Sequence, residues 1–200
     1  MRKSRLVLAS ASATRARLLS AAGIEFDCDP AHVDEAAIKT AMGHASVDAA
    51  EVAHGLGVAK AMAVSERHPG AHVIGGDQIL EHAGQRFDKP ADVDDARRQL
   101  QALRGRTHSL VSGVCVVLGG RLTWRHAETA RLEMRDFSEE FLEDYLIRAE
   151  DAWRHSVGGY HVEGLGAQLF ARIEGDHFTI QGLPLLALLG FLRREGLVAA

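Results

Sequence analysis

Short apolar runs and stretches of helical period alternate along the chain from its first residues. Residues 6–9 are apolar and predict a short buried strand, and the serines that follow directly can cap a helix that ends at Gly23. Residues 24–27 alternate between apolar and polar side chains, which predicts a second strand. A polar loop that contains Asp34 and Glu35 comes next. The chain therefore opens with a strand, a tight turn and a helix N-terminus.

The middle of the chain predicts a long helix followed by a hairpin. Residues 46–67 have a helical pattern that includes two glycines, and a His-Pro-Gly sequence stops it. Residues 72–76 predict a strand, with Asp77 just past its carboxyl end. A hairpin over Gly84 then leads back toward Phe87.

The second half continues to alternate helices and strands. Asp92 can cap a helix that runs to Leu103, and residues 107–118 and 122–134 predict two long strands joined by a glycine pair. Ser138 and the acidic residues after it suit the first turn of another helix.

The final third contains a glycine-rich loop over residues 158–166, a predicted strand over 168–173 and a last helix with Pro184 near its first turn. No internal repeat, low-complexity tract or linker interrupts the pattern. We therefore expect one continuous α/β domain over residues 1–200.

Composition narrows the class of protein. A hydrophobic content of 46% over 200 residues is enough for a packed core. The formal net charge of -4 and the 6% of aromatic residues disfavour a module that binds long nucleic acid, which needs a basic surplus and aromatic platforms. Local basic groups could still bind a small anion, so a nucleotide remains a possible ligand.

Two further features bear on the compartment. Cys28 and Cys115 are far apart in the sequence, so they indicate core thiols and neither a disulfide framework nor a zinc site. The apolar run near the N-terminus is too short for a signal peptide, and residues 183–192 are about half of a membrane span. We expect a cytoplasmic protein without a membrane partner.

The turn between the first strand and helix contains Ser10, Ser12 and Arg15. Backbone N–H groups and the helix dipole favour phosphate at such a turn, and an arginine adds charge-assisted hydrogen bonds. Taken alone, these residues favour a capping serine and a solvated arginine, because strand-serine-helix signals are common.

Asp77 is a second candidate, because ligands of open α/β sheets gather at the carboxyl ends of strands. Its carboxylate can hold a divalent ion or orient a water, and it can equally be a turn or capping residue. Lys60, Lys89 and Glu35 are ordinary surface charges unless they converge on the same site.

Eight short motifs follow one another in order along nearly the whole chain. They are Leu8-Ala9-Ser10-Ala11-Ser12-Ala13-Thr14-Arg15, Val33-Asp34-Glu35, Ala59-Lys60-Ala61, Gly76-Asp77-Gln78, Asp88-Lys89-Pro90, Arg106-Thr107-His108 with Ser112-Gly113-Val114, the glycine-rich loop from Gly158 to Gly166, and Gly182-Leu183-Pro184-Leu185. In this order they resemble the motifs of the Maf family, which opens with L-A-S-x-S-P-R-R and closes with G-L-P-L.

The resemblance implies a Maf/inosine triphosphate pyrophosphatase-like α/β fold, with a curved mixed sheet flanked by helices and a nucleotide cleft between two lobes. It implies a homodimer that hydrolyses nucleoside triphosphates to the monophosphate and pyrophosphate with a divalent cation, Mg²⁺, Mn²⁺ or Co²⁺. Carried over by position, Asp77 accepts the proton of the attacking water and binds the metal together with Glu35. Lys60 and Lys89 complete the catalytic set, and the substrate-binding residues are Ser10, Ser12, Thr14, Arg15, Gln78 and Glu163.

The chain departs from the family pattern at four positions, namely Ala13, Thr14, Ala59 and Asp88. None of these removes a proposed catalytic group. Thr14 belongs to the base-selecting set, so it affects which nucleotide is preferred, and Asp88 places a negative charge beside Lys89.

Gln78 and Glu163 resemble the residues at these positions in the subgroup that acts on 7-methyl-GTP. The subgroup that acts on dTTP and UTP has Thr and Gln there. A carboxylate accepts both N–H bonds of the guanine Watson–Crick edge, and a base made cationic by methylation gains further from that charge. A uracil or thymine edge suits an amide better. The alternative is that Glu163 points into solvent.

Three functions follow from these patterns. The preferred one is a pyrophosphatase for a modified nucleotide such as 7-methyl-GTP, with dTTP or UTP as second choice. A regulator of cell division that binds nucleotide without turnover is a different class, and the retained Asp77, Lys60, Lys89 and Glu35 argue against it. The third, a nucleic-acid-binding module, conflicts with the acidic charge balance.

Overall fold

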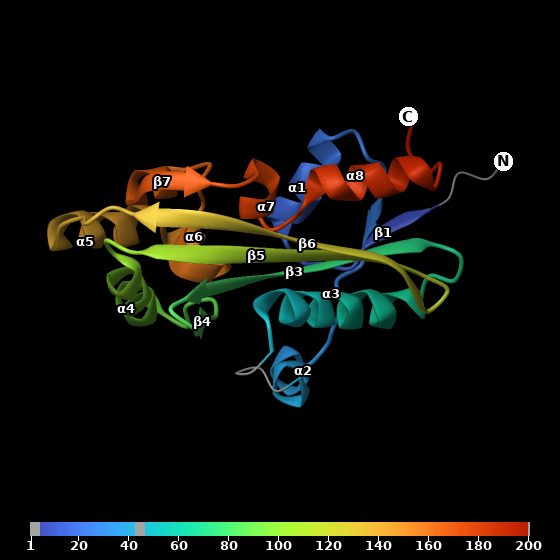
Figure 1. The fold of residues 1–200 in the computed structure, drawn as a ribbon, viewed down its shortest axis with the longest axis horizontal. Helices are drawn as coiled ribbons and strands as arrows, with labels where there is room; N and C mark the ends of the chain where they lie inside the picture. Colours follow the sequence, from blue (N-terminus) through green and yellow to red (C-terminus); the bar gives the residue numbers. More distant parts are fainter. Residues whose placement is uncertain (1–4, 43–46, 200) are drawn as a thin grey trace. The chain divides into compact units, whose positions relative to one another are not determined.

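The computed structural model describes residues 5–42 and 47–199 (Figure 1). The strands are β1 (Leu6–Leu8), β2 (Asp27–Cys28), β3 (His72–His82), β4 (Gln85–Phe87), β5 (Thr107–Leu118), β6 (Arg121–Met134) and β7 (Phe170–Glu174). The helices are α1 (Ala13–Ala21), α2 (Glu35–Ala41), α3 (Ala49–Ser65), α4 (Val93–Leu103), α5 (Glu139–Arg148), α6 (Glu150–His155), α7 (His177–Ile180) and α8 (Leu185–Arg194), with short 3-10 turns η1 (Val157–Gly159) and η2 (Leu165–Leu169). The predicted α/β class is confirmed.

The chain forms two compact units. Unit 1 comprises Met1–Gln78, Val111–Glu128 and His177–Ala200, and unit 2 comprises Ile79–Leu110 and Thr129–Asp176. Strands β3, β5 and β6 contribute residues to both units. The prediction of a single domain stays a prediction.

In unit 1, the strands follow the order β2, β1, β3, β5, β6. β1 pairs in parallel with β2 and with β3, so that Val7 lies between Asp27 and Val73. Figure 1 shows α3 on one face of these strands and α1 with α8 on the other. A strand covered on both faces needs apolar side chains at every position, which explains why residues 6–9 read as a continuous apolar run.

Two apolar clusters fill the two faces of the unit 1 sheet, and alternate strand residues belong to alternate clusters. Residues of the cluster on the α1 and α8 side include Leu6, Leu8, Ile74, Val114, Val116, Leu188 and Leu192. Residues of the cluster on the α3 side include Val7, Ala9, Val73, Cys115, Val117, Ala61 and Val64. Cys115 is thus the core thiol that the sequence predicted, whereas Cys28 is exposed, and that part of the prediction is wrong.

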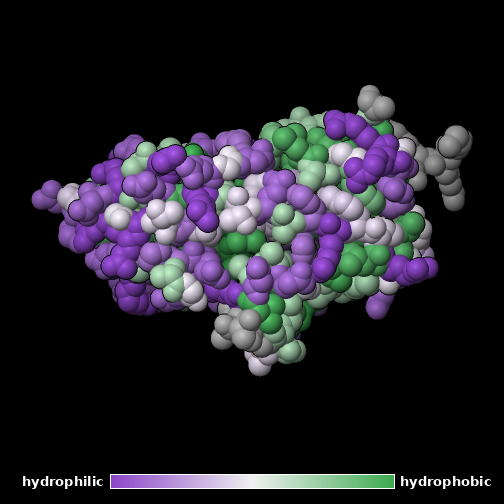
Figure 2. Space-filling view, viewed as in Figure 1, coloured by the Kyte–Doolittle hydropathy of each residue, from purple (hydrophilic) through white to green (hydrophobic). Residues whose placement is uncertain are grey.

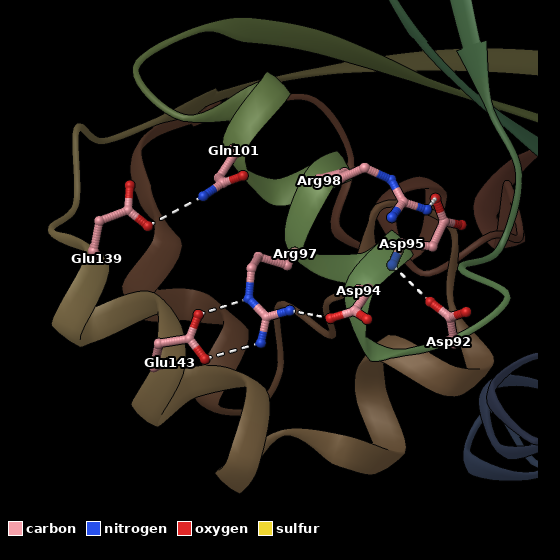
Figure 3. Close-up of polar contacts among 8 residues, drawn as sticks. All are labelled: Asp92, Asp94, Asp95, Arg97, Arg98, Gln101, Glu139 and Glu143. Atoms are coloured by element: carbon pink, nitrogen blue, oxygen red, sulfur yellow. Dashed lines mark hydrogen bonds and ion pairs between the residues drawn. The ribbon is translucent and has the colours of Figure 1, made fainter.

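In unit 2, several polar contacts lie on and between the paired helices α4 and α5 (Figure 3). The Arg97 guanidinium donates two hydrogen bonds to Glu143, at 2.6 and 2.9 Å, and also bonds Asp94. These bonds lower the pKa of the Glu143 carboxyl. Asp92 and Ser138 cap the two helices as predicted. Figure 2 shows that hydrophilic residues cover most of the face over these helices.

The sequence pattern placed the boundaries of several strands and helices wrongly. The second strand is β2, so it begins at Asp27 and not at residue 24, and the last strand begins at Phe170 because residues 165–169 form η2. The predicted long helix begins at Ala49, and its predicted first residue, Ser46, lies outside the described residues. Helices α6 and α7 were not predicted.

Two boundary errors concern candidate site residues. Glu35 is not in a loop, because Asp34 accepts a hydrogen bond from the Ala37 N–H and so caps α2, whose first residue is Glu35. Asp77 does not follow a strand but lies inside β3, which lies beside β5 and runs on to the predicted hairpin, where Leu80 pairs with Phe87 of β4. Among the described residues, no helix is long and apolar enough to cross a membrane.

Candidate active site

The turn from β1 into α1 has the hydrogen bonds that its serines predict. Ser12 is the N-cap of α1, and its hydroxyl accepts from the Arg15 N–H at 3.3 Å. The Ser10 hydroxyl accepts from the Ser12 N–H at 3.2 Å. Thr14 is half-buried in the first turn. The result is a helix N-terminus with two hydroxyls beside it, an arrangement that favours an anion.

Arg15 is not the solvated arginine that its position alone favoured. Its side chain is 8% exposed, and its Nε donates to the Gly182 carbonyl at 2.7 Å while Nη1 donates to the Ser10 hydroxyl at 3.2 Å. Burial lowers the pKa of the guanidinium, and the carboxylates of Asp77 and Glu35 act in the opposite direction. A buried cation held by neutral acceptors keeps charge to offer to a phosphate.

Lys60 lies between two carboxylates from different elements. Its Nζ is 2.8 Å from Glu35 Oε1, at the start of α2, and 3.4 Å from Asp77 Oδ2, in β3. The Lys60 side chain is 12% exposed, that of Asp77 16% and that of Glu35 47%. The three residues that were ambiguous one by one in the sequence therefore converge on one site.

Glycines bring Lys60 close to Asp77. A Cβ built on Gly75 would lie 2.1 Å from the Gly57 carbonyl oxygen in α3, and one built on Gly57 would lie 3.2 Å from the Gly76 Cα. Only glycine allows a helix and a strand to approach this closely. The internal glycine Gly57, which weakens the helical pattern of the sequence, thus sets the distance between α3 and β3, and Lys60 lies one turn further along α3.

Gln78, next to Asp77, has a defined amide orientation. Its Nε2 donates to the carbonyl oxygens of Thr179 and Ile180, at 3.2 and 3.0 Å, and to the Ser112 hydroxyl at 3.0 Å. Carbonyl oxygens only accept, so the nitrogen of the amide must face them. The group that Gln78 has left for a ligand is its acceptor oxygen.

Sequence reasoning missed three residues that hold Gln78 in place. The fully buried Ser112 donates to the Thr179 carbonyl at 2.8 Å, and the Thr179 hydroxyl bonds Glu128 at 2.5 Å. Ser112 stands in one of the eight motifs, which was a usable signal. Thr179 and Glu128 belong to no motif, and their part in the network depends on contacts between distant segments.

The structure brings together seven candidate residues of unit 1, which are Ser10, Ser12, Arg15, Glu35, Lys60, Asp77 and Gln78. Thr14 precedes Arg15 in the first turn of α1, and its role stays a prediction. A Cβ built on Gly76 would lie 3.7 Å from Arg15 Nε, so the arginine is next to this stretch of β3. Lys89 and Glu163 are exposed residues of unit 2, and their roles stay predictions.

The pair of carboxylates suits a hard divalent cation. Glu35 and Asp77 offer oxygen ligands, and the Lys60 ammonium lies between them as a positive group. Mg²⁺ is usually bound through one or two protein carboxylates, with water and substrate phosphates as the other ligands. No group of three or more His, Cys, Asp or Glu side chains suited to a metal is found in the described part of the chain. Two carboxylates are the protein ligands that such a cation usually has, so this donor set fits a cation whose other ligands are water and substrate phosphates.

Known proteins similar to this chain match it over nearly its whole length. The family model described as Maf-like protein matches residues 5–195. A nucleoside triphosphate pyrophosphatase of Paramagnetospirillum magneticum is 55% identical over 190 residues, which is 95% of this chain and 98% of the relative. A 7-methyl-GTP pyrophosphatase of Brucella abortus is 48% identical over 191 residues, 96% of each chain.

The fold also has a counterpart among solved structures. A HAM1 protein from Coxiella burnetii superposes with a TM-score of 0.52 at 15% identity and covers 96% of this chain and 99% of its own. At that identity the likeness concerns the fold alone. The family model and the two relatives, by contrast, match nearly the whole chain in sequence, and they show that the chain belongs to the family of Maf-like proteins.

Proposed function

We propose that this protein hydrolyses a nucleoside triphosphate to the monophosphate and pyrophosphate with the help of a divalent cation. The observation that carries the proposal is the array of Glu35, Lys60 and Asp77 next to the buried Arg15. Phosphoanhydride hydrolysis needs cations to offset the phosphate charge and a carboxylate to orient the water, and the array holds both. Relatives of about 50% identity carry the same activity in their names.

Each residue has a role in this reaction. Water attacks phosphorus, the anhydride bond between the α and β phosphates breaks, and the Asp77 carboxylate accepts the proton of the water. Ser10, Ser12 and Arg15 hold phosphate oxygens at the N-terminus of α1. Phosphate oxygens compete with the two carboxylates for the Lys60 ammonium, so substrate binding draws Lys60 away from Asp77. Lys89 adds a further positive charge.

The cation belongs to the same pair of carboxylates. Glu35 and Asp77 would bind it, and it would supply positive charge to the phosphate oxygens of the substrate. Mg²⁺, Mn²⁺ and Co²⁺ all accept oxygen ligands of this kind.

For the base, we favour 7-methylguanine. Gln78 offers an acceptor oxygen because its N–H groups are used by Thr179, Ile180 and Ser112. The guanine edge is rich in N–H donors, and the Glu163 carboxylate would accept from it as well. A uracil or thymine edge presents acceptors on both sides of one N–H, which leaves carboxylate oxygens unmatched and costs about 1–3 kcal/mol. The name of the Brucella abortus relative agrees with this choice.

Pyrophosphate release from 7-methyl-GTP, GTP, UTP, dTTP and CTP, each with the three cations in turn, tests the proposal. We expect turnover of 7-methyl-GTP. Asp77→Asn should lower kcat by about 10²–10⁴-fold. Glu163→Gln should lower the preference for 7-methyl-GTP over UTP and dTTP, by a smaller factor. Turnover limited to UTP and dTTP would leave the reaction in place and remove the role of Glu163. Nucleotide binding without pyrophosphate from any substrate would instead favour a regulator that binds and does not cut.

A further inference from the structure

The loop that carries Glu163 is closed on itself. The Gly164 N–H donates to the His161 carbonyl at 3.2 Å, and the Ala167 N–H donates to the Gly164 carbonyl at 3.1 Å. A Cβ built on Gly166 would lie 2.5 Å from the His161 carbonyl oxygen, so the two ends of the turn touch. Residues 161–166 therefore form one small unit, which joins the core at Tyr160 on one side and at Leu169 on the other.

Tyr160 is the one of these two anchors whose side chain has a polar group. It is 4% exposed and follows two glycines with positive φ angles. Its ring packs edge-on against Phe170, with the ring centroids 4.8 Å apart. Its hydroxyl lies 2.6 Å from Nε2 of His108, which is 2% exposed in β5. The two residues come from two of the eight sequence motifs, and the proposed reaction uses neither of them.

The pair is a neutral hydrogen bond in an apolar setting. Burial lowers the pKa of His108 to about 4, so its imidazole is uncharged at neutral pH, and burial raises the pKa of the Tyr160 hydroxyl, which keeps its proton. His108 Nδ1 has no hydrogen-bond partner among the described residues, so the bond to Tyr160 is the polar contact that orients this ring. A directional contact of this kind specifies one arrangement of a buried side chain, where apolar packing alone allows several.

We propose that His108 and Tyr160 are positioning residues for base selection, because their buried hydrogen bond sets the direction in which the loop presents Glu163. The inference rests on the proposed function, in which Glu163 reads the base. Neither residue touches the substrate in this account, and both act through the backbone of residues 161–166.

The test compares two quantities, the melting temperature and the ratio of kcat/KM for 7-methyl-GTP to that for UTP. Tyr160→Phe and His108→Leu each remove the bond and leave one buried polar partner unpaired, so both lower the melting temperature. The double variant Tyr160→Phe with His108→Leu leaves neither partner unpaired and regains stability. We expect the ratio to fall about tenfold in all three variants, the size of one net hydrogen bond.

Two controls separate positioning from stability. Leu103→Val shortens a fully buried core side chain of α4 in unit 2, and it lowers the melting temperature without changing the ratio. The double variant Glu163→Gln with Tyr160→Phe should have the same ratio as Glu163→Gln alone, because the hydrogen bond acts through Glu163.

A ratio that follows the melting temperature, and so returns in the double variant, would overturn the inference. A ratio changed by Glu163→Gln but not by Tyr160→Phe would overturn it and leave the proposed function standing. A ratio that Glu163→Gln itself does not move would remove the base reading, and with it the inference.

Discussion

Gly75→Ala tests whether close packing of α3 on β3 sets the geometry of the site. The new Cβ would lie 2.1 Å from the Gly57 carbonyl oxygen and 2.9 Å from the Ala61 Cβ, whereas ordinary contact begins at about 3.4 Å. The atom it meets first is backbone, so α3 must move away from β3 by about 1 Å. Lys60 moves with its helix, so the distance from its Nζ to the Asp77 carboxylate, 3.4 Å in the unchanged protein, increases.

The displacement has two measurable consequences. Overpacking of this size costs about 1–3 kcal/mol of stability, and misplacing a catalytic group by about 1 Å lowers turnover by about 10²-fold. Urea denaturation measures the loss of stability, and thermal denaturation gives the melting temperature of the variant, well below which pyrophosphate release should be measured. Loss of activity then reports the geometry of the folded protein and not the fraction that is folded.

Gly55→Ala is the matched control in the same helix. Its Cβ would meet the sulfur of Met42 at 2.4 Å, but this atom is near the end of a flexible side chain and can turn aside. Alanine also favours the helix over glycine by about 1 kcal/mol. We expect activity within about twofold of wild type. If Gly75→Ala were folded and turned over substrate as fast as Gly55→Ala, the glycine contact would not be what positions Lys60.

Two further predictions concern stability. Gly190→Ala should stabilise α8 by about 0.5–1 kcal/mol in urea denaturation, because the added Cβ meets only Arg194 at 3.7 Å, and a destabilised variant would contradict this. The lowered pKa of His108, about 4 against its usual 6.5, makes the unfolded chain bind the proton first as the pH falls. Stability should therefore drop by about 2 kcal/mol from this residue between about pH 7 and about pH 5. His108→Leu should lack that part of the drop, and equal pH dependence in the two proteins would refute the assignment.

What the sequence predicted well is local in origin. Asp92 and Ser138 cap their helices because a cap needs only a side-chain oxygen and an N–H three residues on. The turn at Gly119-Gly120 joins its two strands because both glycines adopt positive φ angles. These features depend on neighbours in the chain, so a single sequence contains enough information.

What the sequence missed depends on distant partners. The hairpin over Gly84 was predicted and is confirmed, since Leu80 pairs with Phe87. What residues 72–82 alone do not show is that β3 runs unbroken through Asp77 to this hairpin, beside β5, which comes later in the chain. The burial of Arg15 depends on the Gly182 carbonyl, 167 positions away in the chain. For the same reason, the sequence did not reveal the network of Ser112 and Thr179 around Gln78. The order of the motifs did single out candidate residues that the structure brings together, and their roles stay predictions.

The sharing of β3, β5 and β6 between the two units limits how this protein can be divided. The backbone passes from one unit to the other after Gln78, Leu110, Glu128 and Asp176, and the first three passages fall inside strands. No single cut releases either unit, and no continuous stretch of the gene encodes one. A single recombination event between relatives therefore cannot exchange one unit and leave the other intact, and either unit alone can change only by substitution within the shared chain.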